Sequence, residues 1–141
     1  ILGFSAGGHL AVTLSTHFDS GAAGAADAVE RVSSRPDFAV LGYPVVTMVE
    51  AWTHQGSRNN LLGPSPDPAL ARSLSGELTV AKDAPPTFLF HTTADVTVPA
   101  ENSVYYYLAL KKAGVPAEMH IFERGPHGLG LANDDPALAE W

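Results

Sequence analysis

Apolar residues gather in four short runs along the chain, separated by polar, proline-rich or glycine-rich stretches. Three runs are nearly continuous, whereas the fourth alternates, with Ala117, Met119 and Ile121 on one side and Glu118 and His120 on the other. Continuous runs of this length indicate strands buried on both faces, and alternation indicates a strand near a sheet edge with one wetter face. We therefore predict strands at residues 1–4, 38–43, 87–91 and 117–123.

Two segments carry the spacing of helices. Residues 5–17 place Leu10 and Leu14 four apart among small apolar residues, which predicts a helix that is apolar over most of its surface and therefore buried. Residues 99–113 place Val104 and Leu108 four apart, with lysines in the last turn and Gly114 as terminator. The order strand, helix, strand, excursion, strand, helix, strand predicts an α/β fold with a parallel sheet.

The excursion spans residues 45–86, where five prolines interrupt any regular pattern. Within it, Asp67 is placed to cap a short helix that has Pro68 at its first position. A second stretch rich in alanine and glycine, residues 21–27, suits a surface connection. We find no internal repeat and no domain boundary, so we expect one partial catalytic domain over residues 1–141, with 45–86 as an insertion within it.

Composition and charge remove several classes of function. Eight Lys plus Arg against fifteen Asp plus Glu give a formal charge of −7, which disfavours a nucleic-acid partner. The absence of cysteine excludes disulfides, thiolate metal sites and cysteine nucleophiles. No apolar run approaches the roughly 18 residues of a membrane span, so none is expected. Because the chain opens on Ile1 without an initiator Met, we expect a partial sequence, the C-terminal half of its fold.

The first strand and helix meet at a G-x-S-x-G motif formed by Gly3, Ser5 and Gly7. In a nucleophile elbow the serine lies on a sharp strand-to-helix turn, and glycines two residues before and after it let strand and helix approach closely. The serine hydroxyl then stands at a helix N-terminus, where the backbone N–H of Ala6 is available to an oxyanion. We therefore predict Ser5 as nucleophile and Ala6 as an oxyanion donor, although a glycine-rich turn holds a serine by chance in many sequences.

A serine nucleophile needs a base and a carboxylate to orient that base, in the order Ser, Asp, His along this kind of fold. Asp95 follows the third strand and His127 follows the fourth, so both are expected at the sheet edge where parallel strands end. The alternative roles are a helix cap for Asp95 and a plain turn residue for His127. The other histidines lack the spacing of a metal site, and we expect neither a metal nor another cofactor. They are His9, His17, His54, His91 and His120.

The segments 3–11, 91–99 and 123–128 together resemble the α/β-hydrolase fold, and more narrowly the bacterial esterase and lipase-like group that includes acetylxylan and feruloyl esterases. The resemblance implies Ser5 as nucleophile, His127 as base and Asp95 as its orienter, with segment 45–86 similar to a loop that covers the acyl site. Two residues set this sequence apart from related branches of the fold. Phe4 stands where the hormone-sensitive-lipase-like branch usually has Asp, and Ala6 stands where the prolyl-oligopeptidase branch usually has an aromatic residue. The His-Gly-Gly-type loop that supplies a second oxyanion donor in such folds is not among these residues.

The function implied is hydrolysis of short-chain carboxylic esters through an acyl-enzyme, with acetyl groups on a polysaccharide or its oligosaccharides as substrate. A peptidase of the prolyl-oligopeptidase type is the alternative on the same fold. A non-catalytic fragment or binding module is the alternative from another class. Because one oxyanion donor would come from outside these residues, we expect the 141 residues alone to be inactive.

Overall fold

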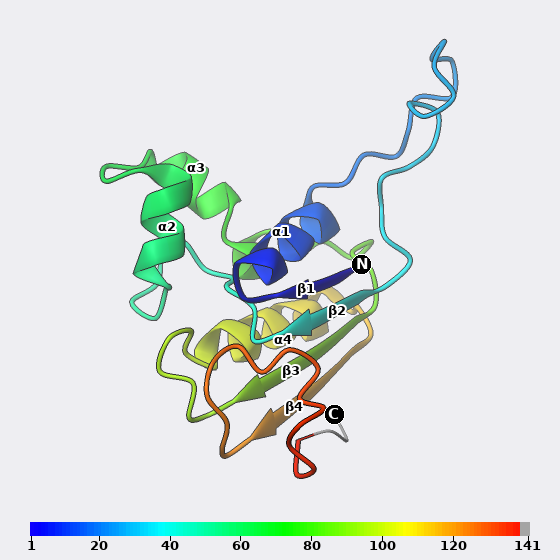
Figure 1. Cartoon of the computed structure of the whole chain (residues 1–141). Helices are drawn as coiled ribbons and strands as arrows, with labels where there is room; N and C mark the ends of the chain where they lie inside the picture. The colour runs from blue at the N-terminus through cyan, green and yellow to red at the C-terminus, as the bar shows by residue number, and fades with distance from the viewer. Residues whose placement is uncertain (139–141) are drawn as a thin grey trace.

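One parallel sheet of four strands forms the framework of the computed structural model, which describes residues 1–138 (Figure 1). The strands lie in the order β1-β2-β3-β4 across the sheet, and each pairs in parallel with the next, which confirms the predicted parallel sheet. Their bounds are Leu2–Phe4 for β1, Ala39–Gly42 for β2, Thr87–Thr92 for β3 and Ala117–Phe122 for β4. Parallel strands end at a common edge, so the loops after them meet there.

Two helices cover the same face of this sheet. Helix α1, Ser5–Thr16, connects β1 to β2, and helix α4, Glu101–Ala113, connects β3 to β4. Side chains from both helices and from β2 and β3 form one buried core, which includes Val12, Leu41, Leu89 and Tyr106. Gly114 ends α4 in the left-handed conformation, with φ of 77°, as the terminator role requires.

The helices bury narrower stripes than their sequences predict. In α1 the side chains of Ala11 and Val12 face the core, whereas Leu10 points away and is 70% exposed. In α4 the buried stripe contains Tyr106 and Leu110, and Leu108 is half exposed. A helix against one sheet buries only the positions that face it, so the prediction that α1 is buried around most of its surface is wrong.

The first strand also differs from its prediction. Residues 1–4 read as a strand buried on both faces, yet Leu2 is 53% exposed. Within the described residues β1 pairs only with β2 and lies at one end of the sheet, opposite β4. The edge position predicted for the alternating fourth strand is the one observed.

The excursion at residues 45–86 holds more regular structure than its prolines indicate. It contains helix α2, Gln55–Leu62, helix α3, Pro68–Ser73, and the short 3-10 helix η1, Gly76–Leu78. Asp67 caps α3 through the N–H of Ala69, as predicted. Helix α2 was not predicted because its sequence is polar; the imidazole of His54 caps its first turn by accepting from the Ser57 N–H. These helices stand beside α1 (Figure 1).

A second, smaller core fixes this segment to the rest of the fold. It is formed by Val45, Met48, Ala71 and Val98, the last of which follows β3. By contrast, the chain between α1 and β2 extends away from the sheet as a long arm (Figure 1). The arm contains the alanine and glycine stretch at residues 21–27, in agreement with the predicted surface connection.

Candidate active site

Ser5 occupies the sharp turn between β1 and α1 in a strained backbone conformation. Its φ is 52°, a left-handed value that is uncommon for residues other than glycine. A Cβ atom on Gly3 would lie 2.5 Å from the carbonyl oxygen of Gly7 and 2.9 Å from the Cβ of Ala11, so no side chain fits there. The turn therefore has the geometry of a nucleophile elbow, with the Ser5 hydroxyl at the N-terminus of a helix.

Among the described residues, no atom crowds the second elbow glycine, Gly7, whereas the adjacent Gly8 is tightly packed. A Cβ on Gly7 would meet no atom within 4 Å, whereas a Cβ on Gly8 would lie 2.6 Å from the Cβ of Pro44. Among the described residues the close packing on the helix side therefore falls at Gly8. The role of Gly7 in the approach of strand and helix therefore stays a prediction, while the chain after β2 is what approaches Gly8.

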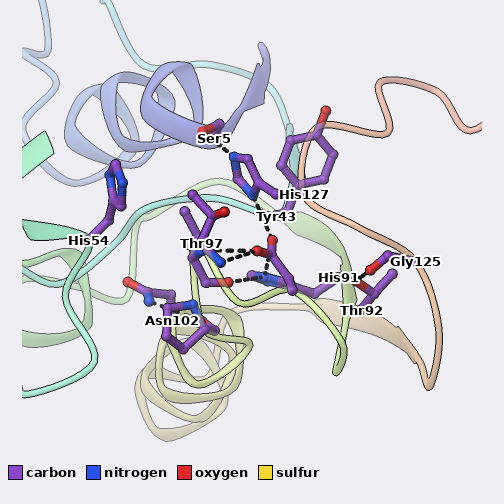
Figure 2. Close-up of polar contacts among 12 residues, drawn as sticks. Ser5, Tyr43, His54, His91, Thr92, Thr97, Asn102, Gly125 and His127 are labelled. Atoms are coloured by element: carbon purple, nitrogen blue, oxygen red, sulfur yellow. Dashed lines mark hydrogen bonds and ion pairs between the residues drawn. The ribbon is translucent and has the colours of Figure 1, made fainter. Parts of the chain in front are cut away.

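Ser5, His127 and Asp95 form a continuous hydrogen-bonded relay, although 122 residues separate the first two (Figure 2). The Oγ of Ser5 is 2.7 Å from Nε2 of His127, and Nδ1 of His127 is 2.6 Å from Oδ2 of Asp95. Because a carboxylate only accepts, Nδ1 carries the proton and Nε2 is free to accept from the serine hydroxyl. The structure thus brings together all three residues singled out from the sequence.

Both oxygens of the Asp95 carboxylate accept hydrogen bonds. Its Oδ1 accepts from the N–H groups of Thr97 and Val98, each at 2.9 Å, while Oδ2 faces His127. Burial alone raises the pKa of Asp95, but hydrogen bonds from His127, Val98 and Thr97 outweigh it and hold the pKa below its ordinary value. Helix α4 begins after Ala100 without a side-chain cap, so Asp95 is not the cap of that helix.

His91 is the residue that sequence reasoning missed. It is fully buried; its Nε2 donates to the Val98 carbonyl at 2.9 Å and lies 3.4 Å from Oδ2 of Asp95, and its Nδ1 accepts from the Ser103 hydroxyl. Burial lowers the pKa of His91, which favours the neutral imidazole. A histidine four residues before the predicted aspartate, at the end of a buried strand, was the available signal.

The other histidines have structural partners. His9 is buried and contacts the Leu74 carbonyl, His54 caps α2, and His120 pairs with Glu118 on the surface. Residues 1–138 contain no group of three or more His, Cys, Asp or Glu side chains able to hold a metal ion. In the same part of the chain, no helix has both the length and the apolarity to cross a membrane.

A cavity of about 410 Å³ opens next to the elbow. Ala6, directly after Ser5, forms part of its wall, and the opposite wall comes from the excursion 45–86 through Met48, Leu61 and Leu74. Ala6 lies in the first turn of α1, where backbone N–H groups have no partner within the helix. The N-terminus of α1 and a largely apolar cavity therefore lie side by side.

Comparisons with known proteins identify the family and the fold of this chain. The BD-FAE family model matches residues 1–110. The chain belongs to the BD-FAE family. This BD-FAE chain is 38% identical over 135 residues to endo-1,4-beta-xylanase B of Butyrivibrio fibrisolvens, with 96% of the chain and 21% of the relative covered. It is 34% identical to an acetylxylan esterase of Xylanibacter ruminicola, with 93% and 26% covered.

A solved structure resembles the BD-FAE chain over nearly its whole length. This is an acetyl ester-xyloside bifunctional hydrolase from Caldicellulosiruptor lactoaceticus, 56% identical, with a TM-score of 0.96. The match covers 99% of this chain and 51% of that one. The chain thus spans about a quarter or less of the curated relatives and half of the solved relative. The predicted α/β-hydrolase fold and the esterase-like family are confirmed.

Proposed function

We propose that this chain carries the nucleophile, base and orienting carboxylate of a serine esterase that cleaves short-chain carboxylic esters through an acyl-enzyme. The observation that carries the proposal is the unbroken relay from Ser5 through His127 to Asp95. A hydroxyl is a weak nucleophile until a neighbouring base accepts its proton, and a base needs a third group to fix its tautomer. Both requirements are met by side chains within hydrogen-bonding distance.

The chemistry follows from these contacts. The Ser5 oxygen attacks the ester carbonyl while Nε2 of His127 takes its proton, and Asp95 stabilises the resulting imidazolium. The carbonyl oxygen becomes negative and receives the Ala6 N–H at the start of α1. His127 then protonates the leaving alcohol, which yields an acyl group on Ser5. A water molecule, deprotonated by the same histidine, releases the acid and restores the serine.

The substrate class we propose is an acetyl ester of a xylan-type polysaccharide or its oligosaccharides. The names of the acetylxylan esterase and the acetyl ester-xyloside hydrolase support this choice. The cavity beside Ala6, walled mostly by apolar side chains, supports a small acyl group next to the nucleophile. Segment 45–86 supplies one wall of that cavity, so we propose that it covers the acyl site.

The test uses the full-length protein that contains this chain. Wild type and Ser5→Ala are compared on p-nitrophenyl acetate, on acetylated xylan and on an acetyl anilide with a matched leaving group. We expect turnover of both esters, little of the anilide, and loss of both activities together with fluorophosphonate labelling in Ser5→Ala. A preference for the anilide would instead support a prolyl-oligopeptidase-type peptidase. Absence of labelling and turnover in the wild type would support a binding module.

A further inference from the structure

His127 lies on a segment that contains neither helix nor strand. We call residues 123–131, which follow β4, the His127 loop. Three glycines in it adopt left-handed or related conformations, with φ of 133° at Gly125, 85° at Gly128 and 57° at Gly130. Glycine-rich backbone has many accessible conformations. The position of the imidazole therefore depends on contacts that the loop makes with the sheet.

The first such contact comes from the end of β3. Thr92 is buried, and its hydroxyl donates to the carbonyl oxygen of Gly125 at 2.7 Å (Figure 2). A Cβ on Gly125 would lie 2.9 Å from the methyl group of Thr92, so the two residues are packed together as well as hydrogen-bonded. Thr92 stands three residues before Asp95. It therefore links the strand that presents the carboxylate to the loop that presents the imidazole.

The second contact comes from the end of β2. The hydroxyl oxygen of Tyr43 accepts from the N–H of Gly130 at 2.7 Å, and the edge-to-face packing of its ring against His127 has a centroid distance of 5.0 Å. The same ring contacts Phe4, the residue before the nucleophile. Tyr43 is buried and has φ of 37°, so its own backbone is strained. Tyr43 thus contacts the loop on both a backbone group and the catalytic imidazole.

We propose that Thr92 and Tyr43 are positioning residues that hold the His127 loop so that the imidazole spans Ser5 and Asp95. Their contacts bracket His127, at Gly125 two residues before it and at Gly130 three residues after it. Neither residue takes a proton or forms a bond in the reaction, so both act through His127. The inference rests on the proposed esterase function of the same site.

Loss of these contacts has a characteristic kinetic result. A displacement of about 1 Å in a catalytic group can lower the rate roughly 100-fold, while the pocket that binds substrate is unchanged. We therefore expect Thr92→Val, which removes the hydroxyl but keeps the branched shape, to lower kcat about 10- to 100-fold with KM nearly unchanged. Tyr43→Phe keeps the ring contact with His127, so we expect a smaller loss, about 3- to 10-fold.

The experiment compares these variants in the full-length protein with matched controls. Thr92→Ser retains the hydroxyl and should recover most of the activity, and Thr93→Val, at an exposed neighbouring position, should behave as wild type. The decisive comparison is in the His127→Ala background, where Thr92→Val should cause no further loss because the residue acts through the imidazole. A further loss of similar size in that background, or wild-type kcat in Thr92→Val, would overturn the proposal.

A readout independent of turnover separates this proposal from the esterase function. The Nδ1 proton of His127, in its short bond to Asp95, should give a strongly deshielded proton resonance. We expect that resonance in wild type and Thr93→Val, and its loss or broadening in Thr92→Val at temperatures where the variant remains folded. An unchanged resonance in Thr92→Val would refute the positioning role. Absence of ester turnover with the expected resonance changes would refute only the esterase function.

Discussion

Ser5 combines a strained backbone with a hydroxyl group that is hydrogen-bonded to His127. Its left-handed backbone places the hydroxyl at the start of α1, and Gly3 leaves the space that this turn needs. Strain of this kind costs on the order of 1–3 kcal/mol and persists only where surrounding structure enforces it. Here the strand and the helix on either side enforce it, and the backbone oxygen of Ser5 is further tied to the N–H of Val45.

At the triad, we expect the three side chains to act as one unit. Ser5→Ala and His127→Ala should each lower kcat roughly 10,000-fold or more, and the double variant should be hardly worse than either single one. Asp95→Asn should cost about as much or less, because it leaves the imidazole in the wrong tautomer. Steady-state kinetics on p-nitrophenyl acetate check this. Additive losses, or wild-type activity in Asp95→Asn, would contradict the assignment.

The lowered pKa of Asp95 also predicts an effect on stability. Because the folded-state pKa lies below the unfolded value of about 3.9, the ionised carboxylate stabilises the fold above that pH. That contribution is lost as the pH falls through the lowered folded-state pKa. We expect the Tm of wild type to exceed that of Asp95→Asn near neutral pH, with a gap that narrows on acidification below about pH 4. If the difference in Tm between the two proteins stays constant across these pH values, the ionised Asp95 carboxylate does not stabilise the fold as we expect.

At the scale of helices and strands, a buried side-chain amide at the start of α4 helps to hold the excursion 45–86 in place. Asn102 accepts from the N–H groups of Val46 and Thr47 and donates to the carbonyl of Trp52. These bonds give partners to backbone groups that lie beyond the end of β2 and therefore do not pair within the sheet. Together with the small core around Met48, they hold in place the segment that walls the cavity beside Ser5.

Removal of that amide should therefore destabilise the protein. Asn102→Ala leaves buried backbone groups without partners, each at a cost of about 1–3 kcal/mol, and we expect the free energy of unfolding to fall by roughly 3 kcal/mol in total. Urea denaturation of the full-length protein measures this. Asn59→Ala, on the exposed side of α2, serves as the matched control and should change stability little. An equal change in the free energy of unfolding in the two variants would show that the Asn102 contacts contribute no more to stability than an exposed side chain does.

At the scale of the whole molecule, the sheet assembles the site. Ser5 follows β1, Asp95 follows β3 and His127 follows β4, so three strand ends supply the relay at one edge. The remaining strand, β2, is followed by Tyr43, which packs against His127. All four strands thus contribute to a site that no single segment of the chain could form.

The assembled site predicts one pH dependence for the whole reaction. Since the base must be neutral to accept the serine proton, kcat/KM should be lower in acid than near neutral pH, which a pH profile between about pH 5 and 9 measures. Chelators should have no effect, because the proposed nucleophile, base and oxyanion donor all belong to the protein. Loss of activity in EDTA and its return with zinc would contradict the serine mechanism.

Local patterns in the sequence were sufficient for much of the fold and for the three triad candidates. The strands, the ends of α3 and α4, and the elbow at Ser5 depend on side chains within a few residues of one another, through capping, turn sterics and alternation. The order of Ser, Asp and His, each after a different predicted strand, was visible in the sequence as well. The strands and the helix ends were therefore predicted correctly or nearly so, and the catalytic roles of the three residues stay predictions.

Only the tertiary structure decided the contacts between distant segments. Which face of α1 is buried, why Gly8 rather than Gly7 is crowded, and how His91 reaches Asp95 all depend on where strands and loops lie in space. The bond from Thr92 to Gly125 joins residues 33 apart in the chain. The periodicity of apolar residues indicates whether a residue can be buried. It does not identify the residue that it contacts, because that contact is determined by the packing of the whole sheet.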